Sequence, residues 1–137
     1  MSFAAGLALA LSLALNGSSG LVLPTAPLMP QAESVQQYVE SYFADEPVLI
    51  AIAGCESHFT QYDKDGSIYR GVQNKKDVGV MQINEFYHEG TADKLGLDLY
   101  TIEGNVIYAR YLYEKQGTGP WNASAPCWNK KNKIALR

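Results

Sequence analysis

The sequence has few residues from which a metal site could be built. Its two histidines, His58 and His88, lie far apart, and its two cysteines, Cys55 and Cys127, form no C-x-x-C pair. Neither spacing is typical of zinc ligands. Residues 61–72 contain a D-x-D-G turn but have Gln and Val at the positions where a calcium loop begins and ends with carboxylates. We therefore expect no metal and no cofactor, and a β-turn or short hairpin in that segment.

Positive charge is also scarce. With 11 Lys and Arg against 14 Asp and Glu, the formal net charge is −3, which argues against a protein that coats nucleic acid. Residues 130–137 carry four basic side chains, and we expect them to form a frayed, solvated tail. The chain has no internal repeat, and its 137 residues, 47% of them hydrophobic, suit one folded domain and a monomer.

The first charged residue of the chain is Glu33. Before it, the apolar run 3–15 is too short to span a membrane comfortably and is typical of a signal peptide. No basic residue precedes this run, and no clean small-x-small cleavage motif follows it. The run could therefore also be a membrane anchor or a buried helix. We assign residues 1–23 to a signal peptide or N-terminal anchor, 24–32 to a proline-rich linker and 33–129 to the folded domain. The export signal predicts a protein of the periplasm, cell envelope or exterior.

Hydrophobic periodicity predicts a mostly helical domain. Apolar residues recur at helical spacing over 35–43. The next helix, 47–57, begins at a proline and is apolar on nearly every side, which indicates a buried central helix. We expect a turn-rich or small β lobe over 60–84 and further helices around 91–95 and 103–116.

Glu56 lies at the end of this apolar helix. A water-excluded carboxyl has a raised pKa, as a general acid working near neutral pH requires. The pattern alone equally allows Glu56 to emerge into solvent after the last apolar turn.

The segment 77–84 reads D-V-G-V-M-Q-I-N. Gly79 could let the backbone approach a ligand closely. Gln82 and Asn84 offer paired donors and acceptors that suit sugar hydroxyls and amides. Taken alone, this segment is weak evidence for a site.

Four segments together resemble a known family. Residues 53–59 read A-G-C-E-S-H-F, 79–84 read G-V-M-Q-I-N, 103–112 read E-G-N-V-I-Y-A-R-Y-L, and 121–128 read W-N-A-S-A-P-C-W. In this order they resemble the signatures of the lytic transglycosylase (SLT) domain of the lysozyme-like superfamily, over most of the folded chain. The resemblance implies a mainly α, lysozyme-like fold in which helices and a small β lobe form a cleft.

The resemblance also implies an activity, the cleavage of peptidoglycan glycan strands at the β-1,4 bond between N-acetylmuramic acid and N-acetylglucosamine. Glu56 matches the family's catalytic acid, which protonates the leaving oxygen and then acts as a base on the muramic 6-hydroxyl, giving a 1,6-anhydro end. Ser57 would support the site, and Gln82 and Asn84 would shape the cleft. Tyr111 matches a family tyrosine near the catalytic carboxyl.

Asp77 supports a second interpretation, because D-x-G-x-x-Q-I-N also resembles animal (c-type) lysozymes, whose second carboxylate occupies that position. The chain would then be a hydrolase that uses Glu56, Asp77 and water. A hydrogen bond from Asp77 that fixes the Gly79 loop is the role we favour. A third interpretation is a glycan-binding module without activity, since a fold does not determine a function.

The two cysteines fit an exported protein. A bridge between Cys55 and Cys127 would close a loop of 71 intervening residues, contribute about 4 kcal/mol and tie the Trp128 segment to the catalytic helix. Two reduced thiols are the alternative. We expect His58 near the cleft mouth or on the surface, and His88 on the surface or in packing contacts.

Overall fold

The computed structural model describes residues 33–135, with side chains through residue 133. The expected signal peptide or anchor (1–23), the linker (24–32) and the last two residues of the basic tail lie outside this range. Within it, no helix is both long and apolar enough to cross a bilayer.

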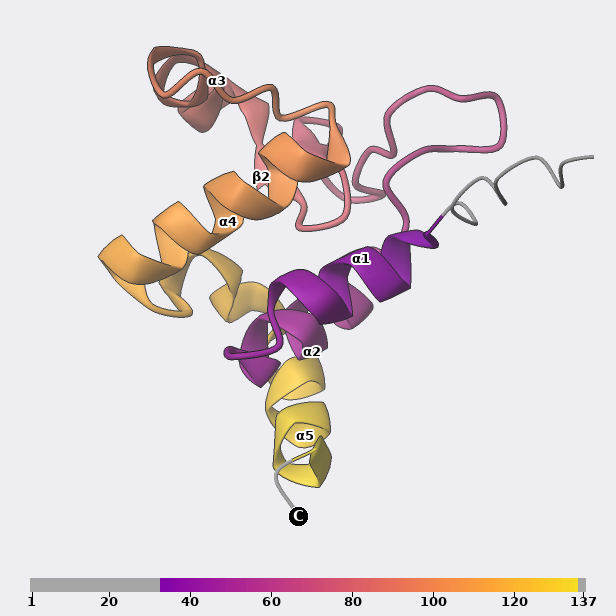
Figure 1. Cartoon of the computed structure of the whole chain (residues 1–137), viewed down its shortest axis with the longest axis vertical. Helices are drawn as coiled ribbons and strands as arrows, with labels where there is room; N and C mark the ends of the chain where they lie inside the picture. The colour runs from indigo at the N-terminus through magenta and orange to yellow at the C-terminus, as the bar shows by residue number, and fades with distance from the viewer. Residues whose placement is uncertain (1–32, 136–137) are drawn as a thin grey trace, which may run out of the picture. The chain divides into compact units, whose positions relative to one another are not determined.

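The described domain is mainly helical with one small antiparallel sheet, as predicted for the fold class (Figure 1). In chain order its elements are helices α1 (Val35–Tyr42) and α2 (Pro47–Glu56), strands β1 (Asp77–Val78) and β2 (Ile83–Asn84), helices α3 (Glu85–Lys94) and α4 (Ile102–Gln116), the 3-10 helix η1 (Gly119–Ser124) and helix α5 (Ala125–Ala135).

Local signals determine where the helices begin. Ser34 forms a capping box at α1, because its hydroxyl accepts from the Gln37 N–H at 3.2 Å and the Gln37 side chain accepts from the Ser34 N–H at 3.0 Å. Pro47 occupies the first turn of α2. The Thr101 hydroxyl accepts from the Gly104 N–H at 3.0 Å and caps α4.

Helix α2 forms the centre of the core, which confirms the prediction of a buried helix. Its residues Leu49, Ile52 and Ala53 have no exposed surface. Helices α1 and α5 and the η1 segment all pack against α2. The helix ends at Glu56, and Ser57 is its C-cap rather than its last helical residue.

The segment 60–84 forms the predicted turn-rich β lobe. Tyr62 and Ile68 pair across a tight hairpin, in which Gly66 has a φ of +83° and its N–H donates to the Asp63 carbonyl at 2.9 Å. The Asp65 carboxylate accepts from the N–H and hydroxyl of Ser67, as expected of a turn.

The C-terminal helix differs from the expected frayed tail, because residues 130–135 continue α5. This helix packs along α2, and the Cys55–Cys127 disulfide joins its first turn to the end of α2. The bridge confirms the predicted pairing. The first turn of α5 packs against α2 and is bonded to it through the disulfide, so the basic residues that follow can continue an existing helix. Amino-acid composition does not show such packing.

Candidate active site

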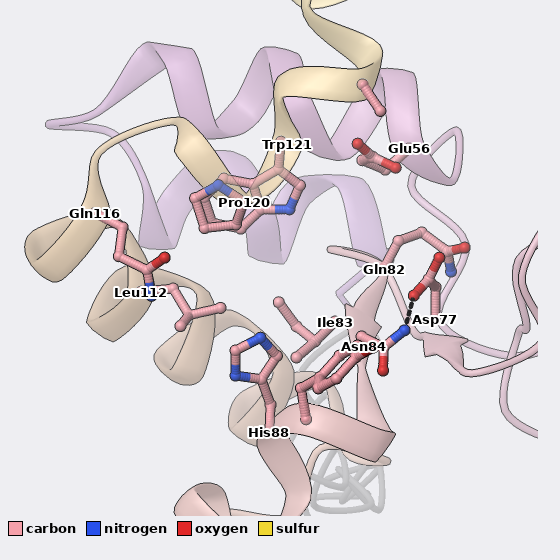
Figure 2. Close-up of a pocket in the computed structure, with 12 residues that line it drawn as sticks. Glu56, Asp77, Gln82, Ile83, Asn84, His88, Leu112, Gln116, Pro120 and Trp121 are labelled. Atoms are coloured by element: carbon pink, nitrogen blue, oxygen red, sulfur yellow. Dashed lines mark hydrogen bonds between the residues drawn. The ribbon is translucent and has the colours of Figure 1, made fainter.

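Glu56 lies in the middle of a groove. Two cavities of about 350 and 380 Å³ adjoin at this point, and Glu56, Asp77, Gln82 and Ala123 line both of them. The first cavity extends toward α3 and α4, and the second extends over the loop 69–74. Figure 2 shows the first cavity, with Glu56 and Asp77 among the side chains around one opening. The side chain of Glu56 therefore faces a groove that continues on both sides of it.

The surroundings of Glu56 favour its protonated form. Burial raises the pKa of this carboxyl above its ordinary value, and the negative charge of Asp77 raises it further. The Ser124 hydroxyl donates to Glu56 Oε1 at 2.5 Å, and this hydrogen bond opposes the rise in pKa. The balance is a raised pKa, as the sequence-based argument from the apolar helix predicted.

Asp77 joins the β lobe to the groove. Its Oδ1 accepts from Asn84 Nδ2 at 2.7 Å and from Asn74 Nδ2 at 3.3 Å, while its carbonyl accepts from the Gly71 N–H at 2.9 Å. The carboxylate thus fixes strand β2 and the 71–76 loop. The Gly79 N–H donates to the Tyr69 carbonyl, while the bond between Asp77 and Asn84 closes the base of the β1–β2 turn that contains Gly79.

Ser57 stabilises the backbone next to the groove without lining it. It is 2% exposed, and its hydroxyl donates to the Val80 carbonyl at 2.7 Å and accepts from the Thr60 N–H at 3.1 Å. These bonds tie the end of α2 to the 78–81 segment, and Ser57 is not among the residues that line the groove.

Gln82 lines the groove in an unusual conformation. Its φ is +51°, in the left-handed region that side-chain-bearing residues seldom adopt. Its Nε2 donates to the Gly79 carbonyl at 2.8 Å, which stabilises the tight turn between β1 and β2. The predicted cleft residues Gln82 and Asn84 therefore lie together on the wall that also carries Asp77.

Asn105 anchors this turn from α4. Its side chain accepts from the Met81 N–H at 2.9 Å and donates to the carbonyls of Val78 and Leu99 at 3.1 and 2.9 Å. Gly79 has a φ of +72°, and a Cβ atom there would lie 2.5 Å from Asn105 Nδ2. The glycine thus allows the close approach of Asn105 rather than of a ligand.

Tyr111 does not line either cavity. Its ring packs 5.4 Å from the Tyr108 ring, and the Lys115 ammonium lies 5.8 Å from it. The groove residues of α4 are Leu112 and Gln116. The structure therefore does not bring Tyr111 into the lining that Glu56, Gln82 and Asn84 share.

Further residues line the groove that the sequence analysis did not place among the site residues. Ser124 contacts Glu56, and His88 lines the first cavity, where burial lowers its pKa. Trp121 is 3% exposed and donates from Nε1 to the Met81 carbonyl at 2.9 Å, so it forms a packed wall. His58 is exposed at the edge of the second cavity, as expected.

Across the part of the chain that the structure describes, no group of three His, Cys, Asp or Glu side chains could hold a metal ion. No family model, curated protein or solved structure matches the chain. The likeness to SLT domains therefore rests on the four sequence motifs and their order.

Proposed function

We propose that this protein is a peptidoglycan lytic transglycosylase that uses Glu56 as its acid and base. The observation that carries the proposal is the place of Glu56, whose pKa burial raises, at the midpoint of the groove. An acid that cleaves inside a glycan strand needs sugar-binding space on both sides of it, and the two cavities supply that space.

The proposed reaction needs no water. Protonated Glu56 donates its proton to the glycosidic oxygen, and the bond from that oxygen to C1 of the muramic residue breaks. The Glu56 carboxylate then takes the proton of the muramic 6-hydroxyl, whose oxygen bonds to C1 and closes the 1,6-anhydro ring. Glu56 ends protonated, and the Ser124 hydroxyl holds its carboxyl in one orientation throughout.

A hydrolase is the second candidate, because Asp77 places another carboxylate in the lining of both cavities. In that reaction Asp77 would stabilise or attack the developing cation at C1, and water would complete the cleavage. A glycan-binding module without activity is the third candidate. Such a module would bind the glycan in the groove and would not need Glu56 to transfer a proton.

The substrate implies an exported protein, and the Cys55–Cys127 bridge supports this proposal. Disulfides persist in oxidising compartments such as the periplasm and the cell exterior. Attachment to the membrane through residues 1–23 remains part of the same proposal.

Digestion of purified peptidoglycan sacculi separates the three candidates. The oxidised protein should release muropeptides with 1,6-anhydro ends, which mass spectrometry distinguishes from reducing ends by the loss of one water. We expect Glu56→Gln to abolish release and Asp77→Asn to retain it in part. Glu114→Gln, at an exposed position on α4 outside the groove lining, is the matched control.

Each other result selects a different function. Reducing ends, with Asp77→Asn as inactive as Glu56→Gln, would establish the hydrolase. Sacculus binding without release would establish the binding module.

A further inference from the structure

The arm of the groove between α3 and α4 contains a histidine that the proposed reaction does not use. His88 lines this arm together with Leu112 and Gln116 of α4. Figure 2 shows the His88 ring extending from α3 into the space that these residues border. The side chain is partly buried, although its neighbours Phe86 and Tyr87 are 75% and 73% exposed.

Tyr108 orients this ring. The Tyr108 hydroxyl lies 3.1 Å from His88 Nδ1, and the tyrosine is only 1% exposed. A buried hydroxyl proton requires an acceptor, and Nδ1 lies within reach of it. When Tyr108 donates to Nδ1, the ring proton lies on Nε2, the nitrogen that does not face Tyr108.

Burial lowers the pKa of His88 below its ordinary value, which favours the neutral ring. A neutral imidazole with its proton on Nε2 is a hydrogen-bond donor there. Asn84 also lines this cavity, where its Nδ2 donates to Asp77 at 2.7 Å.

We propose that His88 is a substrate-binding residue whose Nε2–H donates to an oxygen of the glycan in the α3–α4 arm, with Tyr108 as the positioning residue that sets its tautomer. The inference rests on the proposed function and names a contact beyond the catalytic carboxyl. A strand of hydroxyl, ether and acetamido oxygens suits this arm, because the arm combines a neutral donor, an amide and apolar surface.

Kinetics on a soluble peptidoglycan tetrasaccharide test the contact. We expect His88→Ala to raise KM by roughly 3- to 10-fold, the range for loss of one hydrogen bond, with kcat changed much less. His88→Gln should recover part of the loss, because its amide nitrogen can donate from a similar reach. An unchanged KM in His88→Ala would overturn the inference.

A spectroscopic measurement tests the role of Tyr108 and does not depend on turnover. The chain has two histidines, so His58→Ala leaves one imidazole to observe by ¹⁵N NMR. In the Glu56→Gln background we expect His88 to be protonated on Nε2 alone and its resonances to shift when the tetrasaccharide is added. Tyr108→Phe should give a mixture of tautomers and a KM increase similar to that of His88→Ala.

The two proposals fail separately. Cleavage by the wild type with unmoved His88 resonances would overturn the histidine contact and leave the lytic activity in place. Shifted resonances with no cleavage by the wild type would support the contact and overturn the lytic activity. Because the NMR experiment uses intact histidine, it remains decisive if His88→Ala fails to fold.

Discussion

At Glu56, burial and hydrogen bonding act in opposite directions on one carboxyl. Burial and the charge of Asp77 favour the protonated form, while the Ser124 hydroxyl favours the ionised form. A general acid that must also serve as a base works best between these extremes, because both states must be reachable during one turnover. The two effects together are what the proposed chemistry requires of this residue.

The raised pKa of Glu56, caused by burial, predicts a stability change with pH. The native state holds this proton more tightly than the unfolded chain, so the stabilisation is fully present below the ordinary value of 4.5 and is lost as pH rises through the folded value. We therefore expect Glu56→Gln, which cannot ionise, to gain stability relative to the wild type as the pH is raised. Urea unfolding at about pH 4 and about pH 8 measures this difference. A difference in stability that stays constant with pH would contradict the assignment.

Removing the Ser124 hydroxyl should raise the pKa of Glu56. Because that bond lowers the pKa of Glu56, we expect Ser124→Ala to move the alkaline limb of the kcat/KM profile to higher pH. The exposed Ser41→Ala on α1 is the control. A limb that stays in place, or moves to lower pH, would show that Ser124 does not act on the acid.

The sequence points to Glu56 as the candidate acid but not to its hydrogen-bond partner. Glu56 ends an apolar helix, a local pattern that is visible in the chain. Ser124 reaches it from 68 positions away through tertiary packing, which a single sequence does not encode locally. On α4, helical spacing could have identified the groove residue. Leu112 lies seven positions after the buried Asn105 and therefore on the same face of the helix, whereas Tyr111 lies on another face.

At the scale of elements, the β1–β2 turn forms a wall of the groove and is fixed from two sides. Asn105 of α4 accepts from the Met81 N–H, and Gln61 of the β lobe accepts from the Val80 N–H at 2.8 Å. Both anchoring side chains have no exposed surface. Buried polar groups with complete hydrogen bonding rigidify a turn, which keeps Gln82 and Asp77 at a fixed place relative to Glu56.

Gly79→Ala should therefore be strongly destabilising. The left-handed φ of +72° and the contact of 2.5 Å with Asn105 both oppose a Cβ atom, and we expect a loss of roughly 3 kcal/mol or more. Gly90→Ala is the matched control, since a Cβ atom within α3 at that position meets open space and should stabilise the protein by about 0.5–1 kcal/mol. Equal effects in chemical denaturation would contradict the role assigned to Gly79.

The start of helix α3 could not be predicted from hydrophobic periodicity. The sequence predicted a helix around 91–95, but α3 begins at Glu85, directly after β2. Its first turn carries Phe86 and Tyr87 on exposed positions, so it has no apolar stripe to reveal it. The turn is held instead by Glu85, which pairs with Arg70 at 2.9 Å and with Lys76 at 3.3 Å, contacts made only in the folded chain.

At the scale of the whole described domain, the groove is assembled from segments far apart in the sequence. Helix α2 supplies the proposed acid, the β lobe supplies one wall, and α4 with η1 supplies the other. The Cys55–Cys127 bridge links α2 to the segment that follows Ser124, so it constrains both the fold and the hydrogen bond to Glu56.

Loss of the bridge should reduce both stability and activity. For a cross-link over a separation of 72 residues, we expect the Cys55→Ser, Cys127→Ser double variant to lose about 4 kcal/mol in urea unfolding. Activity should fall at temperatures where the variant is still folded, because Ser124 is less well held. Two free thiols in unfolded, non-reduced wild-type protein would show that the bridge does not form.

The chemical identity of the glycan ends released from sacculi tests the central claim most directly. If Glu56 is the acid and base of a lytic transglycosylase, the wild type releases 1,6-anhydro muropeptides and Glu56→Gln releases none. Unchanged release by Glu56→Gln, with any kind of end, would contradict the account.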